Sequence, residues 1–274
     1  MALLPSDNRL KLEKMIEDEK IESDLRGYLG ISSIGDPCPR KLWYSFRQCF
    51  REKITARQAR LFQRGHREEP IIQTDLRKIG IICNVDQDNQ PEVITGHGHI
   101  KGHFDDLLDN VREAPKTRHL GEYKTANDKS FKDTKKRGVK ASKPLYYDQM
   151  VCYMYLEKLT RALFIMVNKN DDSRHYERVK ADTSRAKQLI KRGIDIISTE
   201  TPPQKIGGPD WYYCKWCGAY DICQFHKPII KTSRTCQNVA ICDNGKWECD
   251  LYGINLTFPQ QIQACKKYKK FNSL

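Results

Sequence analysis

The stretch GHFDDLLDNVREAPKTRHLGEYK, from Gly102 to Lys124, holds the acidic and basic side chains on which the interpretation of this sequence depends. Its last four residues are typical of an extended strand, in which side chains alternate between two faces. Glu122 and Lys124 are therefore expected on one face and Tyr123 on the other. If the segment containing Asp105 pairs with this strand, two carboxylates and an ammonium group meet at one edge.

This arrangement predicts a metal site, because carboxylates held together are unfavourable unless a divalent cation lies between them. A hard metal ion held by Asp105, Glu122 and the Tyr123 carbonyl would lower the pKa of a bound water and polarise a phosphodiester. Lys124 would orient the nucleophile or neutralise developing charge. A Glu-x-Lys pair is also common as a plain cross-strand ion pair, so the assignment depends on residues elsewhere in the chain.

Further motifs lie on both sides of this stretch. Upstream, Glu69 lies on a predicted helix, where it would add another metal ligand. Downstream, Gln149 and Tyr153 are four residues apart on a predicted helix and so share a face. Residues 115–143 contain ten Lys or Arg against three acids. This basic stretch lies where a phosphate backbone would run.

The pattern of apolar residues predicts an α/β fold with a central mixed sheet flanked by helices. Helices are expected near residues 8–27, 39–50, 55–79, 145–159 and 183–197. Strands are expected near residues 92–100, 103–108, 119–125, 162–168 and 174–181. A breaker stretch near Thr201 separates this part from a cysteine-rich end, which is expected to be short, irregular and held together by metal.

Composition narrows the class of function. The 274 residues carry 48 Lys or Arg and 35 Asp or Glu, a net charge of +13 that favours a polyanionic partner such as DNA. The longest apolar run, residues 162–167, is far shorter than the roughly 20 residues of a membrane span. The first residues lack the pattern of a secretory signal. We therefore expect a cytoplasmic protein that does not bind membranes.

With these motifs in this order, the sequence resembles the PD-(D/E)xK nucleases, specifically the RecB-like exonucleases. The matching motifs are Gly65-x3-Glu69, Gly102-x-x-Asp105, Glu122-x-Lys124 and Gln149-x3-Tyr153. The resemblance implies a restriction-endonuclease-like core and a DNA exonuclease that depends on Mg²⁺ or Mn²⁺. The sequence departs from the family pattern at Phe104, where Pro is frequent, and at Glu69, where His is frequent. Because His66 lies one turn earlier, either residue is a candidate for the first-motif ligand.

The resemblance also assigns roles to particular residues. It implies a metal held by Glu69, Asp105, Glu122 and Tyr123. The implied catalytic residues are Asp105, Glu122, Lys124, Gln149 and Tyr153. From the basic stretch we expect DNA contacts by Lys129, Lys132, Lys135, Lys136 and Arg137.

Three cysteines in ten residues, Cys214, Cys217 and Cys223, indicate metal or cluster binding in a chain without an export signal. Cys38 precedes a basic and aromatic helix. This resembles the iron–sulfur branch of the same nucleases, which includes CRISPR-associated RecB-like exonucleases and AddB-type subunits. The resemblance implies a structural 4Fe-4S cluster on these four cysteines. Four thiolates also suit Zn²⁺, so zinc stays open as an alternative.

The last four cysteines suggest a second metal site. Cys236, Cys242, Cys249 and Cys265 are candidate Zn²⁺ ligands, because a segment of this length is hard to order without a metal. The expected organisation is an iron–sulfur nuclease domain at residues 1–228 and a cysteine-rich module at residues 229–274.

Two functions from different classes follow. The first is a metal-dependent exonuclease acting on single-stranded DNA or duplex ends, with a structural cluster. The alternative is a DNA-binding or spacer-acquisition or recombination partner with little nuclease activity, working with recombination or CRISPR-adaptation proteins. Digestion of DNA in the presence of Mn²⁺ distinguishes the two.

Overall fold

Five strands of the described residues form a mixed sheet, in the order β10-β9-β8-β7-β4. The computed structural model describes residues 6–18 and 20–271. β8 and β9 run parallel to each other, and the other neighbours are antiparallel. The strands are β4 (Ile82–Cys83), β7 (Asp106–Asp109), β8 (His119–Ala126), β9 (Arg161–Asn168) and β10 (Arg174–Lys180).

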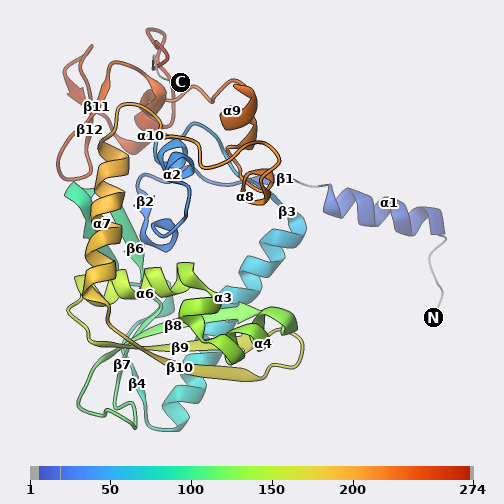
Figure 1. The fold of residues 1–274 in the computed structure, drawn as a ribbon. Coiled ribbons are helices and arrows are strands. Elements are labelled where there is room, and N and C mark those ends of the chain that lie inside the picture. The colour runs from blue at the N-terminus through green and yellow to red at the C-terminus, as the bar shows by residue number, and fades with distance from the viewer. Residues whose placement is uncertain (1–5, 19, 272–274) are drawn as a thin grey trace.

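Helices cover both faces of this sheet, as the side chains of β9 show. Leu163, Ile165 and Val167 pack in one apolar cluster with Ile72 and Leu76 of α3 (Ala56–Lys78). Ala162, Phe164 and Met166 point to the other face, into the main core with α6 (Pro144–Leu156) and α7 (Thr183–Ser198). This alternation explains why β9 is apolar throughout, and it confirms the predicted mixed sheet flanked by helices (Figure 1).

Local sequence explains where the main helices begin and end. α3 begins with a capping box between Thr55 and Gln58, and its chain turns away at Gly80, whose φ of +84° suits glycine. α7 is capped by Asp182, whose side chain accepts from the Arg185 amide. The Arg185 guanidinium in turn donates two hydrogen bonds, of 2.8 and 2.6 Å, to the buried Asp148 on α6. The packing of α6 against α7 is thus fixed by a bidentate ion pair.

The remaining helices are shorter than α3, α6 and α7, and the remaining strands are short. The other helices are α1 (Ser6–Glu17), α2 (Pro39–Phe46), α4 (Asp128–Arg137), α5 (Val139–Ser142), α8 (Tyr212–Lys215), α9 (Tyr220–Phe225) and α10 (Phe258–Gln261). The other strands are β1 (Lys20–Glu22), β2 (Leu29–Gly30), β3 (Lys53–Thr55), β5 (Glu92–Thr95), β6 (Ile100–His103), β11 (Val239–Ile241), β12 (Trp247–Cys249) and β13 (Ile254–Asn255). They form a β2-β6-β5 sheet, a β1-β3 pair and a C-terminal β11-β12-β13 sheet.

Several expected elements differ from the structure. The helix expected over residues 39–50 ends at Phe46, and the strand expected over residues 103–108 begins only at Asp106. The helix expected over residues 8–27 ends at Glu17, and the chain then pairs β1 with β3. The strand expected over residues 92–100 is interrupted by a short 3-10 turn, in which His97 has a φ of 55°. The chain therefore reverses there, and β5 pairs antiparallel with β6.

The C-terminal end is also more ordered than expected. Residues 229–274 were expected to be irregular, but β11, β12 and β13 form a small sheet. Its Trp247 is fully buried and lies 5.2 Å from Phe46 of α2, ring centre to ring centre. Arg234 is also fully buried and donates to the carbonyl oxygens of Gly27 and Phe46. The sheet therefore shares the main core, and the division into two domains stays a prediction.

Candidate active site

Pairing between β7 and β8 brings the predicted carboxylates together. Asp106 lies opposite Gly121 in an antiparallel register, so Asp105, one residue earlier, comes level with Glu122. Both carboxylates are buried, Asp105 at 8% exposure and Glu122 at 0%. The Tyr123 amide donates to Asp105 Oδ2 at 2.7 Å, which fixes that carboxylate at the strand edge.

The ammonium of Lys124 lies among three oxygens. Its Nζ is 2.5 Å from Glu122 Oε1, 3.4 Å from Asp105 Oδ2 and 3.1 Å from the Tyr123 carbonyl oxygen. Apart from this contact, neither oxygen of Glu122 has a hydrogen-bond donor among the described residues. A buried carboxylate in this state needs a cation nearby. The three oxygens around Lys124 are those predicted from the sequence to hold a metal ion.

Glu69 reaches this cluster from α3. Its side chain is 16% exposed, whereas that of His66 is 80% exposed, and the two lie 3.5 Å apart. Burial raises the pKa of Glu69, and the negative charge of Asp105 raises it further. Gln90 donates to Glu69 Oε2 at 3.3 Å. Of the two candidates for the first motif, Glu69 is therefore the one whose charge is coupled to the carboxylates.

Burial and neighbouring charges shift the pKa values of Glu122 and Lys124. Burial raises the pKa of Glu122 to about 8, and Asp105 adds to this effect while Lys124 opposes it. Burial alone would lower the pKa of Lys124, but Asp105 and Glu122 outweigh it and the pKa is raised. Lys124 therefore stays charged and serves as the counter-ion of the cluster.

Asp106 has a structural role that the sequence did not reveal. It is fully buried, and its Oδ2 accepts from Gln73 Nε2 at 2.7 Å and from the Tyr123 hydroxyl at 2.9 Å. Its Oδ1 accepts from the amides of Asn84, Val85 and Leu107. Strand alternation is the signal that separates it from Asp105, because neighbouring residues point to opposite faces.

The two expected residues of α6 lie near this edge. The Tyr153 hydroxyl donates to the His103 carbonyl at 2.8 Å, and its ring packs edge-on against Phe104. Tyr153 thus holds the turn that carries Asp105. Gln149 is buried, and its role toward a phosphate stays a prediction. Tyr146, on the same helix, also lies near the cluster, because the centre of its ring is 5.7 Å from Lys124 Nζ.

The five expected DNA contacts all lie on α4, which follows β8 directly. Phe131 and Thr134 of this helix are buried, while the basic residues are exposed. Within the helix, Lys132 pairs with Asp128 at 2.8 Å and Arg137 pairs with Asp133 at 2.6 Å. The structure therefore presents these cations to solvent next to the strand that carries Glu122 and Lys124.

The cysteines expected to hold a cluster come from two distant parts of the chain. Cys38 caps α2, and its Sγ accepts from the Lys41 amide at 3.4 Å. Burial raises the pKa of Cys38, and Cys223 adds to this, while Cys38 in turn contributes to the raised pKa of the half-buried Cys217. Cys214 contacts Gln224 and the Gly207 carbonyl. The fold thus brings Cys38 near Cys217 and Cys223.

Three of the four C-terminal cysteines lie together. Cys236, Cys249 and Cys265 line one small cavity. Cys242 instead donates to Glu248 Oε2 at 3.5 Å and lines a different cavity. In residues 6–18 and 20–271, no group of three or more His, Cys, Asp or Glu side chains is arranged to hold a metal ion as it stands. The zinc site, the iron–sulfur site and the Mg²⁺ or Mn²⁺ site at the carboxylates therefore all stay predictions.

Comparisons with known proteins give structural likeness only. No protein-family model and no curated protein matches this sequence. An alkaline exonuclease (LHK-Exo) from Laribacter hongkongensis is similar with a TM-score of 0.47 at 18% identity, over 63% of this chain and 87% of that one. A structure described as SSO0001 is similar with a TM-score of 0.41 at 15% identity, over 81% of this chain and 98% of that one. In the part of the chain that the structure describes, no helix is both long and apolar enough to cross a membrane.

Proposed function

We propose that this protein is a metal-dependent DNA exonuclease of the RecB-like PD-(D/E)xK type. The observation that carries the proposal is the meeting of Asp105, Glu122 and Lys124 at the edge shared by β7 and β8. Buried carboxylates beside an ammonium are a recurrent arrangement for hydrolysis of a phosphodiester. The basic helix α4 supports DNA as the substrate, because its exposed cations can neutralise backbone phosphates.

Mg²⁺ or Mn²⁺ would be held by Glu69, Asp105, Glu122 and the carbonyl of Tyr123. The donor set fits, because hard divalent cations prefer carboxylate and carbonyl oxygens and the oxygens of Glu122 lack hydrogen-bond donors among the described residues. When bound, the ion would supply a water of lowered pKa and polarise the phosphate.

The residues of the chain itself account for the rest of the chemistry. Lys124 keeps its proton and would orient the attacking water or neutralise charge on the phosphate as the bond breaks. The Tyr123 amide fixes Asp105, and Tyr153 holds the turn before it, so the carboxylates are positioned before substrate arrives. Gln149, on the same helix as Tyr153, would contact the phosphate.

The finer features of the proposal concern the cysteines. A 4Fe-4S cluster on Cys38, Cys214, Cys217 and Cys223 would join α2 to the segment of α8 and α9, which is supported by the proximity of Cys38 to Cys217 and Cys223. Zn²⁺ is proposed for the C-terminal cysteines, supported by the three that line one cavity. Such a protein would belong to the iron–sulfur branch, act in the cytoplasm and work with recombination or CRISPR-adaptation proteins.

A cleavage assay tests the function. End-labelled single-stranded and duplex DNA are incubated with the full-length protein in Mn²⁺, in Mg²⁺ and in EDTA. The proposal predicts that the DNA is shortened stepwise to mononucleotides in the presence of either metal ion and is not cleaved in EDTA. DNA that is bound but left intact under every condition would contradict the proposal and favour the alternative of a DNA-binding partner.

A further inference from the structure

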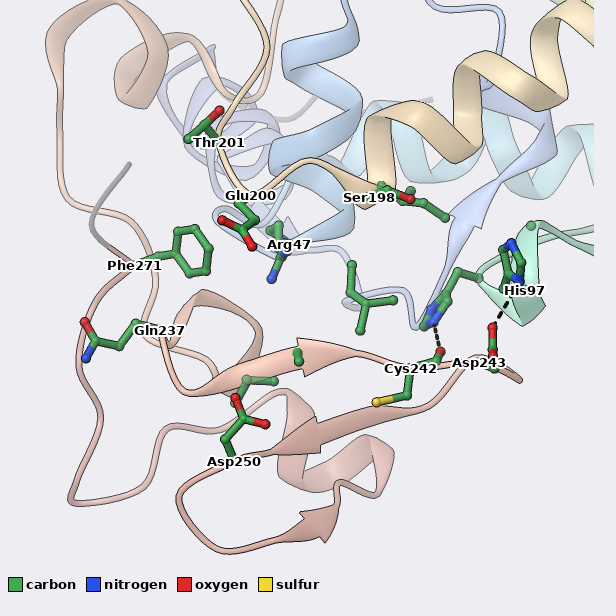
Figure 2. Close-up of a pocket in the computed structure, with 16 residues that line it drawn as sticks. Arg47, His97, Ser198, Glu200, Thr201, Gln237, Cys242, Asp243, Asp250 and Phe271 are labelled. Atoms are coloured by element: carbon green, nitrogen blue, oxygen red, sulfur yellow. Dashed lines mark hydrogen bonds and ion pairs between the residues drawn. The ribbon is translucent and has the colours of Figure 1, made fainter.

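A large cavity lies between the main core and the C-terminal sheet, apart from the carboxylate cluster. Its volume is about 1030 Å³, and none of Asp105, Glu122 and Lys124 lines it. Figure 2 shows its walls, which come from the residue after α2, the turn before β6, the end of α7 and the strand β11. Volumes of about 300–1,000 Å³ are usual for sites that bind small molecules.

Arg47 gives this cavity its most unusual feature. The side chain is only 4% exposed, and its guanidinium carbon lies 5.2 to 5.6 Å from the ring centres of Trp43, Trp247 and Phe271. Its Nε and Nη1 have no hydrogen-bond partner among residues 6–18 and 20–271. Ring faces attract the charge of a guanidinium but accept none of the hydrogen bonds in its plane. These two nitrogens are themselves covered from solvent, so a ligand in the cavity would meet the rest of the guanidinium, and a buried cation at a cavity wall fits an oxyanion.

The other walls limit what kind of anion can enter. The carboxylates of Glu200 and Asp250 also line the cavity, and Glu200 is close enough to act electrostatically on Arg47. These acids would repel a ligand with many negative charges, such as a DNA strand, but would accept hydrogen bonds from amino groups. The Phe271 ring and the side chains of β11 add an apolar surface suited to a flat ring.

We propose that this cavity binds a nucleoside monophosphate whose base carries an exocyclic amino group. The phosphate would pair with Arg47, the base would lie against Phe271 and the apolar side chains, and the amino group would donate to Glu200 or Asp250. A free phosphate or an amino acid would leave most of the volume empty. The site is separate from the proposed nuclease centre and does not depend on it.

Titration calorimetry in EDTA with the full-length protein tests this proposal. The probes are dCMP, dUMP, which replaces the amino group of the base with a carbonyl, and deoxycytidine, which lacks the phosphate. We expect dCMP to bind at least about tenfold more tightly than deoxycytidine, and several-fold more tightly than dUMP. No binding of dCMP up to about 5 mM would overturn the proposal.

Variants assign the contacts. Arg47→Gln should lower the affinity for dCMP to that for deoxycytidine and leave the affinity for deoxycytidine unchanged. Unchanged binding of deoxycytidine shows that the cavity is intact. Asp250→Asn, at an exposed position, should reduce the preference for dCMP over dUMP, and it keeps the test valid if Arg47→Gln does not fold. Arg118→Gln, an exposed control paired with Asp109, should change nothing.

One further variant separates this site from the carboxylate cluster, where a mononucleotide would also be held as a product. Because no metal ion is present in EDTA to hold a product at that cluster, Lys124→Ala should keep the dCMP binding that depends on Arg47. Loss of binding in Lys124→Ala, or an unchanged ratio of dCMP to deoxycytidine in Arg47→Gln, would place the nucleotide elsewhere and overturn the proposal.

Discussion

At the scale of single residues, two neighbouring aspartates have different roles, one in the candidate site and one in the structure. Asp105 faces the ammonium of Lys124, whereas Asp106 accepts five hydrogen bonds: two from the amides that follow β4, and one each from β7, α3 and Tyr123. The sequence predicted the first role, since alternation along β8 puts Glu122 and Lys124 on one face. It did not predict the second, because the donors come from residues that only the fold brings together.

The two aspartates can be separated by substitution. Asp106→Ala should lower the free energy of unfolding by about 3 kcal/mol, because buried donors lose their acceptor. Asp105→Ala should change it by less than about 1 kcal/mol, since it also removes repulsion from Glu122. Urea denaturation of the metal-free proteins measures both, and equal losses would contradict the distinction.

The raised pKa of Glu122 makes stability depend on pH. Its pKa is about 8 in the folded protein against an ordinary value of 4.5, so the folded state prefers the protonated acid. This contribution is complete below about pH 4.5 and is lost as the pH rises through 8. The melting temperature of the metal-free protein should therefore fall from pH 5 to pH 8 because of this group.

Glu122→Gln is the control for this effect, because the amide does not titrate. Its melting temperature should fall less over the same range. Mn²⁺ should stabilise the wild type more at pH 8 than at pH 6, since a metal ligand must lose its proton. A wild type and a Glu122→Gln protein with the same pH profile would show that Glu122 does not titrate as proposed.

At the scale of elements, the length and pattern of the apolar stretches predicted the main helices and strands. The expected ranges for α3, α6, α7, β8, β9 and β10 agree closely with the structure. The failures have local causes. His97 takes a left-handed conformation and splits an apolar stretch into β5 and β6, and no pattern of apolar residues reports such a turn. The short C-terminal strands were missed because they depend on contacts with α2.

The proposed iron–sulfur cluster would link the start of α2 to the segment that contains α8 and α9. Cys38→Ser should lose most of the iron that the wild type carries after purification without oxygen, because a thiolate ligand is removed. Cys83→Ser is the matched control, since Cys83 lies at β4 and should leave the iron unchanged. Elemental analysis of the three proteins decides this. Zinc without iron in the wild type would contradict the iron–sulfur assignment.

At the scale of the whole molecule, the C-terminal sheet is anchored into the core. Arg234 donates to Phe46 and Gly27, and Trp247 lies against Phe46. These contacts join positions about two hundred residues apart. The composition of the tail therefore gave no sign of them. The breaker stretch near Thr201 and the cysteines led to the expectation of a separate module, which stays a prediction.

Trp247→Ala should consequently destabilise the entire protein. We expect a loss of about 3–5 kcal/mol in the free energy of unfolding, because a large buried side chain leaves a cavity. Trp216→Ala is the matched control, since that side chain is 81% exposed and should cost less than about 1 kcal/mol. Thermal unfolding of both variants measures the difference. A Trp247→Ala protein as stable as Trp216→Ala would show that the sheet is a separate unit.

The measurement that tests the central claim most directly is single-turnover cleavage of end-labelled DNA in Mn²⁺ by the wild type, Glu122→Gln and Lys124→Ala, with DNA affinity measured in parallel. If these residues act as one unit around the metal, each substitution should nearly abolish cleavage, and the double variant should be little worse. DNA affinity should persist, because the exposed cations of α4 are unchanged. Cleavage by Lys124→Ala at close to the wild-type rate would contradict this account of the site.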